Sequence, residues 1–130
     1  KGRTSPAVER LIECNILLSG VGFESGGLAL AHAIANGLTI LPECKAMHGE
    51  AVAFGLVVQL RLERAPELDQ VLEFCQRVGL PTTLEELGLG EISDADLQSV
   101  ANAVFRNERN MANEQAKVTK QKLVQLMCEA

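Results

Sequence analysis

Aromatic residues are scarce in this chain of 130 residues, which has no tryptophan, no tyrosine and four phenylalanines. Leu, Val, Ile and Ala must therefore fill the core, and they supply most of the 47% of residues that are hydrophobic. Such a composition, with few β-branched or aromatic runs, favours helices over strands. The length is that of one ordinary domain. We therefore expect a single all-α domain, a multi-helix bundle, over residues 1–130.

Short cysteine motifs are absent as well. The four cysteines are dispersed along the chain, and none forms a C-x-x-C pair. Neither a zinc knuckle nor a redox pair is therefore encoded by them. Dispersed cysteines in a mostly apolar setting are typical of free thiols in a reducing compartment, so we expect a cytoplasmic protein.

Clusters of basic residues and long apolar runs are also lacking. The net charge of −5 arises entirely in residues 66–130, where eleven acidic side chains outnumber six basic ones. An acidic half without clustered Lys or Arg argues against nucleic-acid binding. No apolar run approaches the ~18 residues that span a bilayer, and nothing resembles a signal peptide. We expect no nucleic-acid partner and no membrane partner.

Proline, glycine and capping residues divide the sequence into predicted helices. The predicted helices cover about residues 6–19, 27–36, 49–64, 66–78, 93–105 and 119–130, with a short helical turn at 84–87. Glycines at 20, 22, 26 and 27 are expected to break the chain before the second helix. The helix at 49–64 is apolar almost all round, so we expect it to be the central one.

The only two histidines, His32 and His48, lie in the most apolar stretch, residues 19–60. A buried imidazole needs hydrogen bonds or a metal, because an unpaired polar group in an apolar site costs a few kcal/mol. Two histidines beside one core suggest a shared ligand, and the short connector between their helices predicts that they face each other. The alternative is a pair of hydrogen-bonded core histidines, since a separation of 16 residues is no local metal motif and zinc requires further ligands.

A dinucleotide-binding βαβ unit is a second alternative for this region. Residues 15–18 could form a strand, followed by Gly20 and Gly22, a helix, and Glu43 as the ribose-binding acid. Ser25, however, stands where the G-x-G-x-x-G pattern requires glycine. The segment before Gly20 also has helical rather than alternating periodicity, which disfavours this interpretation.

Several short segments combine into a more specific pattern. They are GFESGGLA at residues 22–29, HA at 32–33, NGLT at 36–39, HGE at 48–50 and VAFG at 52–55. Together they resemble the metal-binding core of the glycerol dehydrogenases, which belong to the iron-containing alcohol dehydrogenase superfamily. Asn36 favours the glycerol enzymes, since the iron-type alcohol dehydrogenases carry a second histidine there. The family's His-Asn-Met-Pro is replaced by Arg-Asn-Met-Ala at residues 109–112, which leaves the role of residues 106–130 open.

The resemblance implies a helical C-terminal domain of the kind found in glycerol dehydrogenase and dehydroquinate synthase-like enzymes. It also implies that the N-terminal NAD-binding domain of such an enzyme lies outside this chain. By the same resemblance, a catalytic zinc between the two domains would be held by an aspartate outside the chain and by His32 and His48. The implied reaction oxidises glycerol to dihydroxyacetone and transfers a hydride to NAD. We expect the chain alone to be inactive, its own N-terminal domain to be a partner, and the parent enzyme to be a homo-oligomer.

The resemblance also implies a polyol site that includes His32 and Phe23. Phe23, on a loop leading to the His32 helix, would offer an apolar wall near the substrate or nicotinamide. The alternative for Phe23 is a hydrophobic loop residue packed into the core.

Two further functions stay open for the chain. One is another polyol or alcohol dehydrogenase of the same superfamily, because a fold does not fix a substrate. The other is a non-enzymatic helical interaction domain in which both histidines are core residues.

Overall fold

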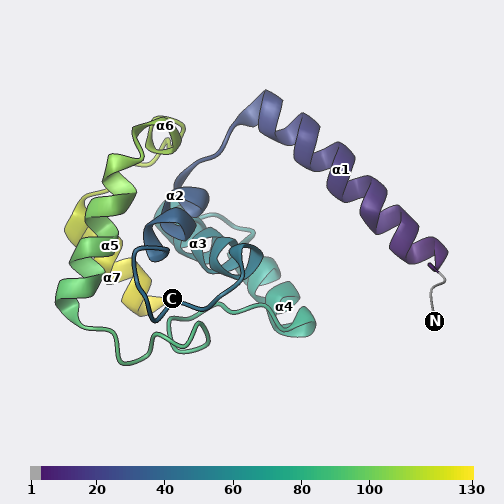
Figure 1. Ribbon diagram of the computed structural model, residues 1–130. Coiled ribbons are helices and arrows are strands. Elements are labelled where there is room, and N and C mark those ends of the chain that lie inside the picture. The colour runs from purple at the N-terminus through teal and green to yellow at the C-terminus, as the bar shows by residue number, and fades with distance from the viewer. Residues whose placement is uncertain (1–3) are drawn as a thin grey trace.

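The computed structural model describes residues 4–130, and every regular element in that range is a helix. The helices are α1 (Pro6–Gly26), α2 (Leu30–Leu38), α3 (His48–Glu63), α4 (Leu68–Val78), α5 (Asp94–Arg106), α6 (Glu108–Met111) and α7 (Lys120–Glu129). Figure 1 shows α2 and α3 in the middle, with α5 and α7 on one side and α4 on the other. The predicted all-α class is confirmed.

The core is centred on α2 and α3. Seven of the nine residues of α2 are buried, and Leu30, Ile34 and Leu38 are completely inaccessible to solvent. The α3 helix contacts α2, α4 and α7, and its Phe54 is the largest fully buried side chain. The central place predicted for α3 is therefore shared with α2, whose short apolar sequence is enclosed on nearly all sides.

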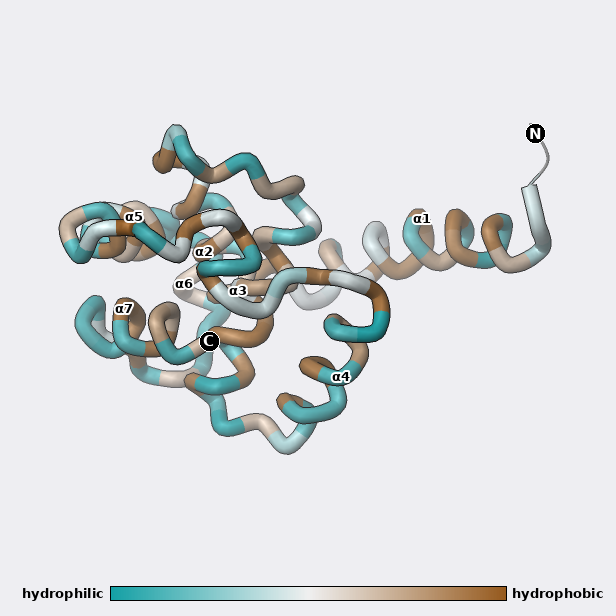
Figure 2. The backbone as a smooth tube through the Cα atoms, turned by 90° about the horizontal axis from the view of Figure 1, so that it is seen from below, coloured by the Kyte–Doolittle hydropathy of each residue, from teal (hydrophilic) through white to brown (hydrophobic). Residues whose placement is uncertain are grey.

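The first helix stands away from this core (Figures 1 and 2). None of its 21 residues is buried, and no contact between α1 and another helix is present in the described part of the chain. The break predicted at glycines 20 to 27 is largely wrong, since α1 continues through Gly20 and Gly22 and ends at Gly26. Each glycine weakens a helix by only about 1 kcal/mol, which does not stop it. The chain leaves the helix at Gly27, where φ is +69°.

The same helix removes the βαβ alternative, because residues 15–18 are helical and not a strand.

Elsewhere the helix boundaries follow the capping signals. The Ser93 side chain accepts a hydrogen bond from the Asp96 N–H at the start of α5, and Thr119 caps α7 in the same way. The predicted helical turn at 84–87 is a run of hydrogen-bonded turns. The four-residue α6 is too short to show a period, and its signal is Asn107, whose side chain accepts a hydrogen bond from the Asn110 N–H.

No individual helix within residues 4–130 combines the length and apolar character needed to cross a bilayer. The helices α1 and α2 reach that length and composition only when joined, and they are bent by 108° where they meet.

Candidate functional site

The two histidines lie side by side in the structure. His32 is the third residue of α2 and His48 is the first residue of α3. Their ring centroids are 5.7 Å apart and the ring planes are tilted by 52°. The prediction that the two imidazoles face each other is confirmed. The apolar runs pack α2 against α3, and this packing joins residues 16 positions apart in sequence.

The pair sits at the edge of the core and not inside it. His32 is half-buried, whereas His48 is exposed. Burial, and secondarily the neighbouring His48, lowers the pKa of His32, which favours its neutral form. Only a neutral imidazole has a lone pair for a metal ion. A site that is part apolar and part open suits a ligand-binding pair better than two core histidines.

Two imidazoles at this spacing fit one zinc ion, but they do not complete a site. Zn–N bonds are about 2.0–2.1 Å long, so a nitrogen of each ring can reach a common ion. A catalytic zinc takes three protein ligands and keeps one position open. Residues 4–130 hold no group of three or more His, Cys, Asp or Glu side chains that could bind a metal. Within the described residues the two histidines alone could therefore contribute to a metal site, and a zinc site of the catalytic type would need a further ligand.

Gln59 is a site-supporting residue that the sequence interpretation missed. Its side-chain Oε1 accepts a hydrogen bond from the Ala31 N–H at 2.9 Å, and its Nε2 donates to Glu63 Oε1 at 2.8 Å. Ala31 directly precedes His32. The available signal was that Gln59 is the only polar residue between positions 51 and 60.

A second long-range hydrogen bond holds the segment before α2. The Asn113 side chain donates from Nδ2 to the carbonyl oxygen of Leu28 at 2.8 Å. The same amide lies against Gly27, where a Cβ would meet Nδ2 at 2.6 Å. Residues after α6 thus help to place the start of the His32 helix, which gives a structural role to part of the region 106–130.

Phe23 does not occupy the predicted loop. It belongs to the last turn of α1 and its side chain is 48% exposed. Both earlier placements, on a loop and tucked into the core, are therefore wrong for the described residues. The extension of α1 through its glycines is the reason. A role for Phe23 as an apolar wall stays a prediction.

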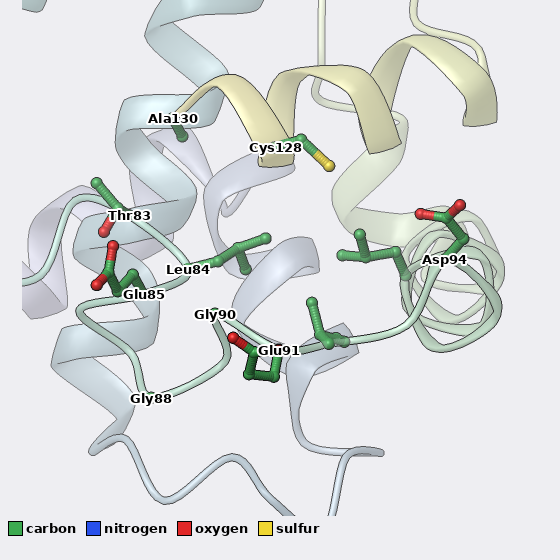
Figure 3. A pocket seen from close by; sticks show the side chains of 11 residues that line it. Thr83, Leu84, Glu85, Gly88, Gly90, Glu91, Asp94, Cys128 and Ala130 are labelled. Atoms are coloured by element: carbon green, nitrogen blue, oxygen red, sulfur yellow. The ribbon is translucent and has the colours of Figure 1, made fainter.

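A large hollow in the described surface lies away from the histidines. It has a volume of about 820 Å³ and is formed by residues 83–97 together with the end of α7. Figure 3 shows Glu85, Glu91 and Asp94 around it, with Cys128 on the α7 side. No histidine lines it, so we do not assign it to the metal site.

No family model matches the chain. A glycerol dehydrogenase of Thermotoga maritima is 50% identical over 118 residues, which are 88% of this chain and 32% of that protein. A glycolaldehyde reductase of Halobacterium salinarum is 44% identical over 116 residues, 87% of this chain and 32% of that protein. The solved structure of a probable glycerol dehydrogenase from Sinorhizobium meliloti superimposes with a TM-score of 0.88 at 40% identity, covering 97% of this chain and 36% of that chain.

These similarities define the chain as a helical domain homologous to part of an oxidoreductase. The similarity is to glycerol dehydrogenases in particular, which confirms the resemblance seen in the sequence motifs. The chain spans about a third of the length of the curated relatives it matches.

Proposed function

We propose that this chain is the metal-binding helical domain of an NAD-dependent glycerol dehydrogenase, in which His32 and His48 bind the catalytic zinc. The observation that carries the proposal is the pairing of the two imidazoles at 5.7 Å. The pair occurs in a chain that is 50% identical to a glycerol dehydrogenase. Its two histidines are the only ones in the sequence.

A zinc ion bound here would act as a Lewis acid toward the alcohol oxygen of glycerol, and NAD would accept the hydride. The balanced reaction is glycerol and NAD⁺ to dihydroxyacetone, NADH and a proton. His32 and His48 would hold the ion by their neutral imidazoles. The packing of α2 on α3 brings the two rings side by side before the ion arrives, so little reorganisation of the helices would be needed on binding.

The proposal requires a second domain, and α1 offers the surface for it. Eight large hydrophobic residues of α1 are between 44% and 73% exposed; they are Val8, Leu11, Ile12, Ile16, Leu17, Leu18, Val21 and Phe23. They are distributed over most of the circumference of the helix, and helices apolar over so wide an arc are normally enclosed by protein. We infer that α1 packs against the NAD-binding domain, which would also bring the third zinc ligand, an aspartate by resemblance.

In this arrangement Phe23, at the end of α1 that leads toward α2, would line the polyol or nicotinamide site. A cytoplasmic location and a homo-oligomeric parent enzyme are further expectations from the resemblance. They stay predictions.

A different small hydroxylated or carbonyl substrate is the second candidate. It is favoured by one specific observation, the 44% identity to a protein named glycolaldehyde reductase. Proteins of one fold differ in substrate through a few residues in the cleft. Parallel assays with glycerol and with glycolaldehyde separate the two candidates.

The test uses the full-length enzyme that contains this chain. His32→Ala and His48→Ala should each abolish NAD-dependent glycerol oxidation, whereas Gln98→Ala, on the exposed side of α5, should leave it intact. Zinc content is measured on the same samples. Full activity in either histidine variant would overturn the proposal.

A further inference from the structure

We propose that Gln59 is a positioning residue for the histidine pair, because it fixes the first turn of α2 on α3 and so holds His32 beside His48. The proposal deepens the proposed function, on which its zinc-binding consequence rests. The juxtaposition itself comes from the structure. The Gln59 amide joins the two helices through its bond to the Ala31 N–H at 2.9 Å.

The bond to Ala31 meets a need of α2. The first turn of a helix has N–H groups without partners inside the helix, and a side chain at the N-cap usually satisfies one of them. The N-cap of α2 is Ala29, which has no polar side chain and makes no such bond. Gln59, which lies 28 residues after Ala31, supplies the acceptor for the Ala31 N–H instead.

Gln59 is also held at its other end. Its Nε2 donates to Glu63 Oε1, one helical turn further along α3, at 2.8 Å. Both polar atoms of the amide are thus paired, in a stretch of α3 that is otherwise apolar. A side chain tied at both ends has few rotamers left, so it defines the position of its partner.

A second contact acts together with this bond. Gly55, one turn before Gln59, lies against the main chain of Ala31, where a Cβ would be 3.0 Å from the carbonyl carbon. The contact at Gly55 sets how closely α2 approaches α3. The bond at Gln59 resists rotation and sliding of α2 at that distance.

The consequence concerns the two imidazoles. His48 belongs to α3 itself, and His32 follows the anchored residue Ala31 directly. Metal ligands have to be placed within about 0.5 Å and 10–20° of the productive geometry. A small rotation of α2 about its own axis would exceed this tolerance at the His32 ring while leaving most of the core contacts in place.

The experiment compares Gln59→Met and Gln59→Glu in the 130-residue chain. Methionine has a similar length and no strong acceptor, whereas glutamate keeps an acceptor for the Ala31 N–H and loses the donor to Glu63. Gln98→Met, at an exposed position of α5, is the matched control. The readouts are the nuclear Overhauser effect between the His32 and His48 ring protons without metal, the affinity for Zn²⁺ alone, and the melting temperature.

We expect Gln59→Met to lose most of the ring-to-ring effect and to bind Zn²⁺ about tenfold more weakly, which is the size of effect typical of residues that orient metal ligands. Gln59→Glu should keep both signals even if its melting temperature falls, and Gln98→Met should match the wild type. If Gln59 had only a structural role, Gln59→Met would lower the melting temperature but leave the ring-to-ring nuclear Overhauser effect and the Zn²⁺ affinity unchanged. Either that outcome, or loss of the ring-to-ring effect in Gln59→Glu, would overturn the proposal.

The nuclear Overhauser effect between the rings distinguishes failure of this proposal from failure of the proposed function. If the wild type does not bind Zn²⁺ but the variants change the ring-to-ring effect as expected, the zinc assignment is contradicted and positioning by Gln59 is supported. If the wild type and Gln59→Met bind Zn²⁺ with equal affinity, the zinc site is supported and the positioning role is contradicted.

Discussion

Gly55 packs directly on the backbone of Ala31, so that a Cβ at position 55 would overlap the Ala31 carbonyl oxygen. No side chain separates α2 from α3 at this crossing. The two histidine-bearing helices therefore approach more closely than ordinary side chains would allow, and Ala31 immediately precedes His32.

Gly55→Ala should therefore push α2 away from α3. We expect the free energy of unfolding to fall by about 1–3 kcal/mol, the usual cost of inserting a group into a packed core. Gly49→Ala is the control on the same helix, because no atom lies within 4 Å of its added Cβ. It should be neutral or stabilising by up to about 1 kcal/mol. Chemical denaturation of both variants checks this, and equal effects would contradict the close-contact account.

Substitutions in the core and in α1 should differ sharply. Phe54 is completely buried, so Phe54→Ala should cost about 3–5 kcal/mol. Leu18 is 67% exposed on α1, and Leu18→Ala should change the free energy of unfolding by less than about 0.5 kcal/mol. Thermal or urea unfolding of the chain measures both. A large loss in Leu18→Ala would show that α1 packs on the body of this chain.

The sequence carried enough information to predict the helical class, the starts of the helices near residues 93 and 119, and the meeting of His32 with His48. These depend on local signals, namely apolar periodicity and side-chain oxygens that accept from the first free N–H groups. The course of α1 was harder to predict. Gly20 and Gly22 suggested a break. The helix nevertheless continues through both, because neither adopts a positive φ, and the first described glycine that does so is Gly27.

The supporting part of the site was less accessible to prediction. The role of Gln59 depends on which face of α3 meets the start of α2, and that relationship is set by the crossing at Gly55. The spacing of residues in the sequence does not determine the angle or the distance at which two helices cross. The described residues place no third candidate ligand beside the two histidines, so the proposed zinc site would take its third ligand from outside them.

Glu114 should make the stability of the chain depend on pH. Burial, and secondarily the nearby Glu63, raises the pKa of Glu114 above its ordinary value of 4.5, although a bond from the Ala116 N–H opposes this. The folded state then holds a proton more tightly than the unfolded state. Stability therefore falls as pH rises from 4.5 through the folded pKa, and it levels off above that value.

Glu114→Gln should remove this dependence while keeping an oxygen that accepts from Ala116. Its melting temperature relative to the wild type should rise with pH above 4.5 and show no such gain below that value. Melting curves over a pH series supply the measurement. A gain that is the same at every pH, or one confined to low pH, would contradict the assigned direction of the shift.

The 130-residue chain alone should show no measurable glycerol oxidation. In the proposed arrangement the described residues supply two metal ligands, whereas a catalytic zinc needs three, and the NAD site is expected on the other domain. Removing part of a catalytic unit reduces the rate far more than it weakens folding. The assay follows NADH formation at saturating glycerol and NAD. Turnover near that of a full-length glycerol dehydrogenase would show that the assigned division of the site is wrong.

The most direct test of the central claim is a Zn²⁺ titration of the wild-type chain, His32→Ala and His48→Ala, with the melting temperature of each recorded alongside. The paired imidazoles predict one saturable site in the wild type that either substitution removes. The loss of stability without metal should be modest, since His48 is exposed and His32 is half-buried. Unchanged Zn²⁺ binding together with a lowered melting temperature would contradict the account and make both histidines structural.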